Sequence, residues 1–368
     1  MTSRKVGIVY DEAFQQHQHP RGLSRGLMHP EIPDRVSAPY AYLKKKDVLQ
    51  KLVHIKSRPA TISELTLVHD EEYINRLKNA KVTDHESIFA KFDITKDIKV
   101  LENLQFEDDK WDSYIHEKTY EAALLSAGSA LQLTEAVLNN DIDSGFALIR
   151  PPGHHAEACY AGGFCYFNNV AIAARYAQLQ GAKKIMIVDW DIHHGNGIQD
   201  IFYDDDSVLY ISLHRYYTFP DLEKAKAEYI GEKKGLGFNI NIAWDETPMG
   251  ECEYKLAFEE VVLPVARKFA PDLILVSCGF DAARGDPLGE FDVSINTYSW
   301  MTTRLLEISK TALFLEGGYN NENLCNGVYA VIMTLLGEYK PDEIFGTANL
   351  VGQQNIETTK NAIKDYWF

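Results

Sequence analysis

The 368-residue sequence lacks the features of a membrane or exported protein. It contains no apolar run of about 18 residues, the length that a helix needs to cross a bilayer. The first residues, MTSRKVGIVYDEAF, show no charged segment followed by an apolar core, so we expect no secretion signal. We therefore expect a protein of the cytoplasm that makes no membrane contact, with the nucleus left open as a second location.

Cysteine and positive charge are also scarce. The five cysteines are an odd number and include no CxxC pair, which argues against a disulfide framework and against a thiolate zinc site. The formal net charge of −16 disfavours binding to nucleic-acid phosphates and favours cationic ligands such as lysine-rich peptides. We therefore expect no nucleic-acid partner.

No repeat, low-complexity tract or flexible linker divides the chain. With 45% hydrophobic residues, the composition supplies ample material for a buried core. Although the length alone also permits two domains, we predict one domain over residues 1–368 and favour a monomer.

Short apolar runs alternate with amphipathic segments along the chain. The runs are rich in β-branched residues, as in strands that are buried on both faces. The segments repeat apolar residues every three or four positions, as helices do. This alternation predicts an α/β fold with a mainly parallel central sheet that is covered on both sides. The predicted strands are residues 6–10, 146–150, 185–190, 208–214, 273–278 and 312–316, and the predicted helices are residues 118–138, 169–180, 252–270 and 296–309.

Potential metal ligands follow two of the predicted strands. Asp189, Asp191 and His193 alternate at the end of one strand, and Asp281 follows another. We expect Asp191, His193 and Asp281 to converge, because the carboxyl ends of parallel strands meet at one edge. Two carboxylates and one imidazole leave a position open for water, as in catalytic zinc sites, although iron and manganese also accept such ligands. The competing interpretation is that each aspartate caps a helix or stabilises a loop.

Paired histidines and a tyrosine follow two further strands. The loop RPPGHHAE presents His154 and His155, which suit proton transfer because imidazoles titrate near neutral pH. Tyr319 follows two glycines in LEGGYN, where its hydroxyl could donate a hydrogen bond to an oxyanion. Alternatively, the two rings bind backbone carbonyls and the tyrosine only packs.

These motifs resemble the class II histone deacetylases, in particular the IIb subgroup. The resemblance rests on HPEIPDR, RPPGHHAE, GGFCYFNN, VDWDIHHGNG, SLHRYY, SCGFDAARGDPLG and LEGGYN, and it covers nearly the whole chain. It implies an arginase-like, three-layer α/β/α fold. It also implies one catalytic zinc ion held by Asp191, His193 and Asp281, with His154, His155 and Tyr319 as catalytic residues.

The resemblance also implies a supporting site for one or two potassium ions. Asp189 would orient His154 and bind potassium together with Ser212 and Leu213, and the backbone carbonyls of Asp191 and His193 would complete the potassium site. In addition, Asn196 stands where some relatives carry an acid beside His155, which implies that His155 is more easily deprotonated in this chain.

Further resemblances concern the substrate. Phe164, preceded by Gly163, and Phe219 resemble the aromatic walls around an acyl-lysine stem, although the segment that holds Phe219 is shorter than in most relatives. Leu288 stands where the polyamine-selective branch carries a glutamate. Ser113 resembles a serine at the rim that binds the substrate backbone, and Arg35 resembles an arginine of an acetate-release channel.

We therefore expect a zinc-dependent deacetylase of N6-acetyl-lysine in proteins or peptides, with a possible role in chromatin regulation. An acetylpolyamine or small-amide amidohydrolase is the main alternative, because the same chemistry serves both. A non-catalytic acetyl-lysine-binding scaffold is disfavoured by the complete set of expected catalytic residues. The segment 81–107 is expected to be longer than in most relatives.

Overall fold

A computed structural model describes residues 4–19, 29–81, 113–220, 223–245 and 248–368. The segment 81–107, which we expected to form a long loop, lies outside these ranges apart from its first residue. Within the described ranges, no helix is both long enough and apolar enough to cross a bilayer.

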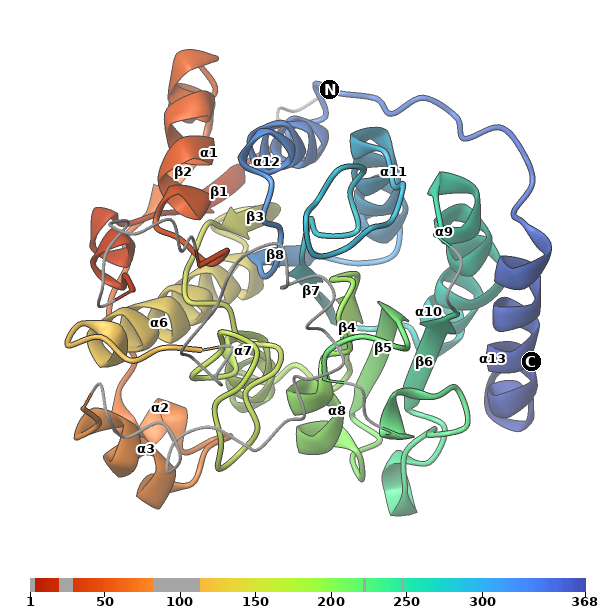
Figure 1. Cartoon of the computed structure of the whole chain (residues 1–368), viewed down its shortest axis with the longest axis horizontal. Coiled ribbons are helices and arrows are strands. Elements are labelled where there is room, and N and C mark those ends of the chain that lie inside the picture. Colours follow the sequence, from red (N-terminus) through yellow and green to blue (C-terminus); the bar gives the residue numbers. More distant parts are fainter. Residues whose placement is uncertain (1–3, 20–28, 82–112, 221–222, 246–247) are drawn as a thin grey trace.

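The core of the fold is an eight-stranded sheet in the order β2-β1-β3-β8-β7-β4-β5-β6. Every pairing between neighbouring strands is parallel, which confirms the predicted mainly parallel sheet. β2 and β6 form the two edges (Figure 1). The strands are β1 (Val6–Val9), β2 (Val53–Ile55), β3 (Ser144–Ala147), β4 (Ile185–Asp189), β5 (Val208–Arg215), β6 (Asn239–Trp244), β7 (Leu273–Cys278) and β8 (Thr311–Leu315).

Helices cover both faces of the sheet, which confirms the three-layer α/β/α fold. α6 and α7 pack together on one face, and α1, α12, α11 and α9 form a row on the other (Figure 1). The α-helices are α1 (Asp34–Lys45), α2 (Ile62–Leu65), α3 (Glu71–Lys78), α6 (Thr119–Leu138), α7 (Asn169–Leu179), α8 (Asn196–Phe202), α9 (Glu251–Ala257), α10 (Leu263–Phe269), α11 (Ile295–Leu306), α12 (Asn321–Leu335) and α13 (Leu350–Trp367). Short 3-10 turns cover Glu12–Gln16, Leu49–Lys51, Glu223–Ala225 and Lys233–Gly235.

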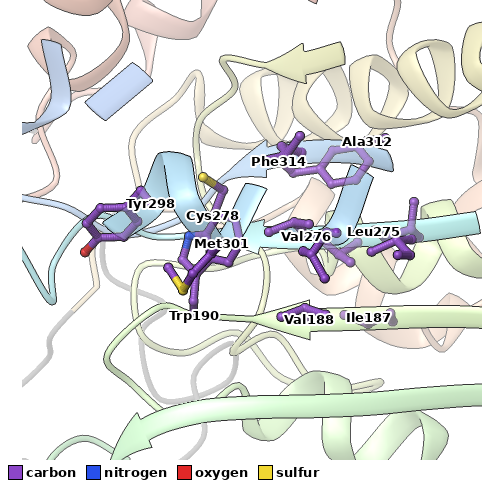
Figure 2. Close-up of a cluster of buried hydrophobic side chains, with 14 of the residues drawn as sticks. Ile187, Val188, Trp190, Leu275, Val276, Cys278, Tyr298, Met301, Ala312 and Phe314 are labelled. Carbon is purple, nitrogen blue, oxygen red and sulfur yellow. The ribbon is translucent and has the colours of Figure 1, made fainter. Parts of the chain in front are cut away.

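The central strands are fully buried because apolar side chains project from both of their faces. Val188 on β4 and Val276 on β7 pack in the same cluster as Phe314 on β8, and Met301 of α11 covers the cluster near the carboxyl ends of the strands (Figure 2). Burial of such side chains stabilises a fold by roughly 1.5–3 kcal/mol each. This rigid layer supports the loops that leave β3, β4, β7 and β8.

Several predicted boundaries were wrong. β3 begins two residues before the predicted strand and ends at Ala147, so residues 148–150 already belong to the loop. The helix predicted over 252–270 is divided by a π-helical turn at Phe258–Val262, just before Pro264 at the start of α10. Proline has no N–H to donate to the preceding turn, which explains a break at this place.

Candidate active site

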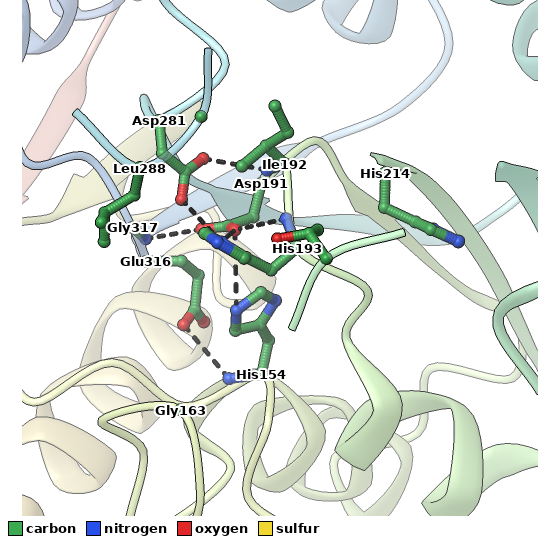
Figure 3. A network of polar contacts seen from close by, with 12 residues as sticks. His154, Gly163, Asp191, Ile192, His193, His214, Asp281, Leu288, Glu316 and Gly317 are labelled. Atoms are coloured by element: carbon green, nitrogen blue, oxygen red, sulfur yellow. Dashed lines mark hydrogen bonds and ion pairs between the residues drawn. The ribbon is translucent and has the colours of Figure 1, made fainter. Parts of the chain in front are cut away.

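Three potential metal ligands converge beyond the carboxyl ends of β4 and β7. These strands are direct neighbours, so the loop with Asp191 and His193 meets the loop with Asp281. One ligand atom from each residue lies within 4.8 Å of the other two. His193 Nδ1 is 3.0 Å from Asp191 Oδ1 and 3.2 Å from Asp281 Oδ2. Figure 3 shows the three side chains turned towards one another.

Backbone amides orient both carboxylates. Asp191 Oδ2 accepts a hydrogen bond from Gly317 N at 2.7 Å, and Asp281 Oδ1 accepts one from Ile192 N at 2.9 Å (Figure 3). A Cβ atom on Gly317 would lie 2.1 Å from Asp281 Oδ2, so only glycine allows this approach. The carboxylates are thus held in place before any ion binds.

The charge distribution fits a divalent cation. Asp191 and Asp281 are fully buried and adjacent, so burial and the negative charge of Asp191 raise the pKa of Asp281 to about 7. Burial opposes protonation of His193, but hydrogen bonds to the two carboxylates raise its pKa to about 10. A cation would relieve the repulsion between these carboxylates, because buried charges need a partner of opposite sign. This donor set therefore suits a metal ion.

The two histidines of the RPPGHHAE loop have different partners. His154 Nδ1 lies 3.0 Å from Asp189 Oδ2, whereas His155 Nδ1 lies 2.9 Å from Asn196 Oδ1. Burial lowers the pKa of His154, but the charges of Asp191 and Asp189 outweigh it and raise the pKa to about 10. Burial and the charge of His154 lower the pKa of His155 well below its usual value. The two rings therefore lie in different electrostatic surroundings: His154 contacts a carboxylate, and His155 contacts a neutral amide.

Aromatic residues surround the histidine pair and Tyr319. The Phe219 ring packs edge-on against His155 with centroids 4.9 Å apart, and the Phe164 ring packs edge-on against Tyr319 at 5.8 Å. Gly163, directly before Phe164, has a left-handed conformation (φ 54°), and a Cβ there would lie 2.1 Å from the His155 ring and 2.8 Å from the Phe219 ring. Only glycine therefore fits against the His155 ring at this position.

Residues 29–335 match the family of the histone deacetylase domain. The chain belongs to this family. It is 40% identical to histone deacetylase 5 of Arabidopsis thaliana over 342 residues, which cover 90% of this chain and 49% of that protein. It is 39% identical to polyamine deacetylase HDAC10 of Danio rerio over 344 residues, which cover 92% of this chain and 49% of that protein.

The fold comparison agrees with this membership. The crystal structure of the HDA15 HD domain superimposes with a TM-score of 0.85 and 37% identity, covering 99% of this chain and 95% of that domain. The chain spans about half the length of the curated relatives it matches. Membership identifies the class of the domain as a hydrolase that acts on amide bonds.

Several other residues that were predicted for the active site of this deacetylase domain lie next to the histidine pair or to Tyr319. Asp189 is aligned with Ser212 in the pairing of β4 and β5, and Leu213 follows. Arg35 is not at the surface but buried, and its Nε donates to the carbonyl of Gly318 at 2.7 Å, next to the backbone of Tyr319.

Ser113 and Leu288 are the remaining residues that were predicted to contact the substrate. Ser113 is buried, and its hydroxyl accepts a hydrogen bond from Phe164 N at 2.9 Å, so it supports the Phe164 turn. Its contact with a substrate stays a prediction. Leu288 is half-buried and is drawn beside the Asp281 loop in Figure 3.

Sequence reasoning missed a buried carboxylate in this deacetylase domain. Glu316 follows β8, and its Oε2 accepts hydrogen bonds from Gly153 N at 2.7 Å and His154 N at 3.1 Å (Figure 3). Burial raises the pKa of Glu316 to about 7. The residue was visible in LEGGYN, but its role depends on a loop more than 160 residues away, so no local pattern could reveal it.

A buried ion-pair network was missed as well. Arg150 Nη2 lies 2.6 Å from Glu31 Oε2, and Arg35 Nη1 lies 3.0 Å from Glu31 Oε1. The two guanidinium groups outweigh burial and lower the pKa of Glu31 to about 2. This network connects the N-terminal part of the domain to the loop that carries the histidines.

Proposed function

We propose that the domain is a zinc-dependent deacetylase of N6-acetyl-lysine in proteins or peptides, releasing lysine and acetate. The observation that supports this proposal most directly is that three potential metal ligands, a pair of histidines held by Asp189 and Asn196, and a tyrosine lie at the ends of four neighbouring strands. The ligand set leaves a position open for water, as catalytic zinc sites do, and membership of the histone deacetylase family favours zinc over iron and manganese.

Each residue of the site has a separate proposed role in the hydrolysis. When bound, zinc would polarise the acetyl carbonyl and make a water molecule more acidic. His155 accepts the proton of the attacking water, and His154, held by Asp189 at 3.0 Å, donates a proton to the leaving lysine amine. The Tyr319 hydroxyl donates a hydrogen bond to the oxyanion; since burial raises its pKa well above 10, the phenol keeps its proton.

Leu288 favours peptide substrates over polyamines. Relatives named as histone and as polyamine deacetylases are almost equally similar to this chain, so overall identity does not discriminate between the two substrates. A distal ammonium group needs an acidic partner, whereas a leucine offers only apolar contact. Because the match to HDAC10 is close, acetylpolyamine hydrolysis is the second candidate function.

We also propose a potassium site at Asp189, Ser212 and Leu213, together with the carbonyls of Asp191 and His193. His214 supports the role of Ser212: its Nε2 donates to the carbonyl of Ala225 at 2.8 Å, so its Nδ1 accepts from the Ser212 hydroxyl at 2.8 Å. A hydroxyl that donates in this way keeps its oxygen lone pairs for a cation.

The test compares hydrolysis of an acetyl-lysine peptide and of N-acetylspermidine by the zinc-loaded protein. We expect preference for the peptide, a loss of about 100-fold in kcat for Tyr319→Phe, and a shift towards the polyamine for Leu288→Glu. Tyr217→Phe, at an exposed tyrosine, serves as the matched control. Preference of the parent protein for the polyamine would overturn the assignment of Leu288, and hydrolysis of neither compound would overturn the proposed activity.

A further inference from the structure

Asn196 links His155 to a second side chain that the reaction described above does not use. The residue begins α8 and is buried. Its Oδ1 lies 2.9 Å from His155 Nδ1, and its Nδ2 donates to Glu157 Oε1 at 2.9 Å. Glu157 belongs to the same loop as His155, so a turn of that loop and the start of α8 are joined through one amide.

The chemistry of the neighbouring atoms determines which way this amide points. Asn196 Nδ2 faces the Glu157 carboxylate at 2.9 Å and the backbone carbonyl of His155 at 3.5 Å. An ionised carboxylate and a carbonyl only accept hydrogen bonds, so the NH₂ group must face them. The Asn196 oxygen is therefore turned towards His155, and only a protonated Nδ1 on that ring can complete the contact.

This orientation selects one tautomer of His155. A neutral imidazole carries a single proton, so a proton on Nδ1 leaves the lone pair on Nε2, the nitrogen that accepts the proton of the attacking water. If the amide were reversed, its NH₂ group would donate to Nδ1 and the ring proton would move to Nε2. The ring could then no longer act as a base at that atom.

We propose that Glu157 is a positioning residue that sets the catalytic tautomer of His155 through Asn196. The inference rests on the proposed function for its consequence in catalysis, but the tautomer itself can be observed without turnover. Glu157 is well placed for this role because the loop holds it firmly: its backbone N–H donates to the carbonyl of Tyr160 at 2.9 Å. Asp200 and Lys224 are the other charged groups that act on its carboxylate.

A purely structural role for Glu157 makes different predictions from a tautomer role. If the carboxylate only joined the loop to α8, its removal would lower stability without changing the ring protons of His155. If it sets the tautomer, an acceptor-only side chain at position 196 should replace it. Asp at position 196 is such a side chain, because either of its oxygens can accept from His155 Nδ1.

The experiment compares four zinc-loaded proteins: the parent, Glu157→Ala, Asn196→Asp and the double variant Glu157→Ala/Asn196→Asp. Nitrogen NMR of histidine-labelled protein identifies the protonated ring nitrogen of His155, with a His155→Ala variant for assignment. Turnover of an acetyl-lysine peptide gives kcat and KM. Glu72→Ala, at an exposed glutamate on α3, controls for the loss of a carboxylate, and thermal unfolding checks that each variant folds.

We expect the Nδ1-protonated form in the parent, a mixture of tautomers in Glu157→Ala with a loss of about 10- to 100-fold in kcat at nearly constant KM, and recovery of both properties in the double variant. Asn196→Asp alone should lose activity, because it places two carboxylates side by side. An unchanged tautomer in Glu157→Ala, or a double variant as impaired as Glu157→Ala, would overturn the proposal.

Should Glu157→Ala fail to fold, Glu157→Gln replaces it: its neutral amide can also donate, so the same mixture of tautomers is expected. If no variant, including the parent, hydrolyses the peptide, the proposed function fails while the NMR result still decides the tautomer.

Discussion

The carboxylate of Asp286 accepts a hydrogen bond from the backbone N–H of Tyr319 at 2.7 Å. The same side chain accepts from Asn320 N at 3.2 Å and, through its other oxygen, from Leu288 N at 3.0 Å. One buried carboxylate thus holds Tyr319, the proposed catalytic tyrosine, and Leu288, the residue proposed to discriminate between substrates, in fixed relative positions. Burial raises its pKa to about 6, although these three amides favour the ionised form.

Replacing Asp286 should impair catalysis through Tyr319. We expect Asp286→Ala to lower kcat by about 10- to 100-fold, because the tyrosine loop loses its anchor while the metal ligands keep theirs. Steady-state kinetics with an acetyl-lysine peptide measures the loss. In a Tyr319→Phe background the same substitution should cost much less, since the hydroxyl that it positions is gone. Equal losses in both backgrounds would show that Asp286 acts elsewhere.

His69 should make the fold sensitive to mild acid. The ring is buried and its Nε2 accepts a hydrogen bond from Asn168 N at 2.9 Å, so burial lowers the pKa of His69 to about 4. The unfolded chain binds a proton below about pH 6.5 and the folded chain does not. Stability is therefore lost as the pH falls from about 6.5 to about 4, by about 3 kcal/mol in total from this group.

The variant His69→Gln tests this share of the pH dependence. Its melting temperature should fall less than that of the parent between pH 7 and pH 5, because glutamine does not titrate. His54→Gln, at an exposed position, should retain the slope of the parent. Parallel curves for His69→Gln and the parent would contradict the assignment.

Removal of the metal should affect both activity and stability. A chelator should abolish hydrolysis and lower the melting temperature by about 5 °C, and added zinc should restore both, because a ligand that binds only the folded state stabilises it. Asp281→Asn should unfold at the same temperature with and without zinc. Asp200→Asn provides a control at an aspartate outside the metal cluster. If zinc did not change the melting temperature of the parent, this result would contradict the proposed metal site.

The glycine beside the two carboxylates should be essential for metal affinity. In Gly317→Ala the new Cβ would meet Asp281 Oδ2 at 2.1 Å and Asp191 Oδ2 at 2.4 Å, so the ligands must move. We expect zinc affinity to fall by about 10- to 100-fold, measured by competition with a chromophoric chelator. Gly250→Ala is the control, because the nearest heavy atom there is 3.4 Å away. If Gly317→Ala bound zinc as tightly as the parent, the close packing of Gly317 against the two carboxylates would not be required for zinc binding.

The central strands could be predicted because their sequences are almost purely apolar, as in LILVSC of β7. β6 was missed because Asn239 and Asn241 interrupt its apolar pattern; both amides are buried against Gln199 Oε1, at 2.8 and 2.9 Å. β2 was missed because it is an edge strand of three residues, of which Val53 and His54 are exposed and Ile55 is half-buried. The local sequence does not reveal such hydrogen-bond partners, because they lie far away along the chain.

The potential metal ligands were easier to predict than the residues that hold the site in position. Asp191, His193 and Asp281 follow strands whose parallel arrangement brings their ends together, so convergence followed from the pattern of strands. Glu157 gave no such signal, because its importance depends on an asparagine 39 residues further along the chain. Geometry between distant segments, rather than residue type, determines which polar side chains cooperate.

The order of strands in the sheet has a consequence for biosynthesis. β3 pairs with β8 and β4 pairs with β7. Within the described part of the chain, the sheet therefore joins β2-β1-β3 to β4-β5-β6 through two strands that the ribosome makes after residue 272. Until then, β3 and β4 each present an unpaired, apolar edge, which is prone to association with other chains. We therefore expect nascent chains that stop before β7 to depend on chaperones.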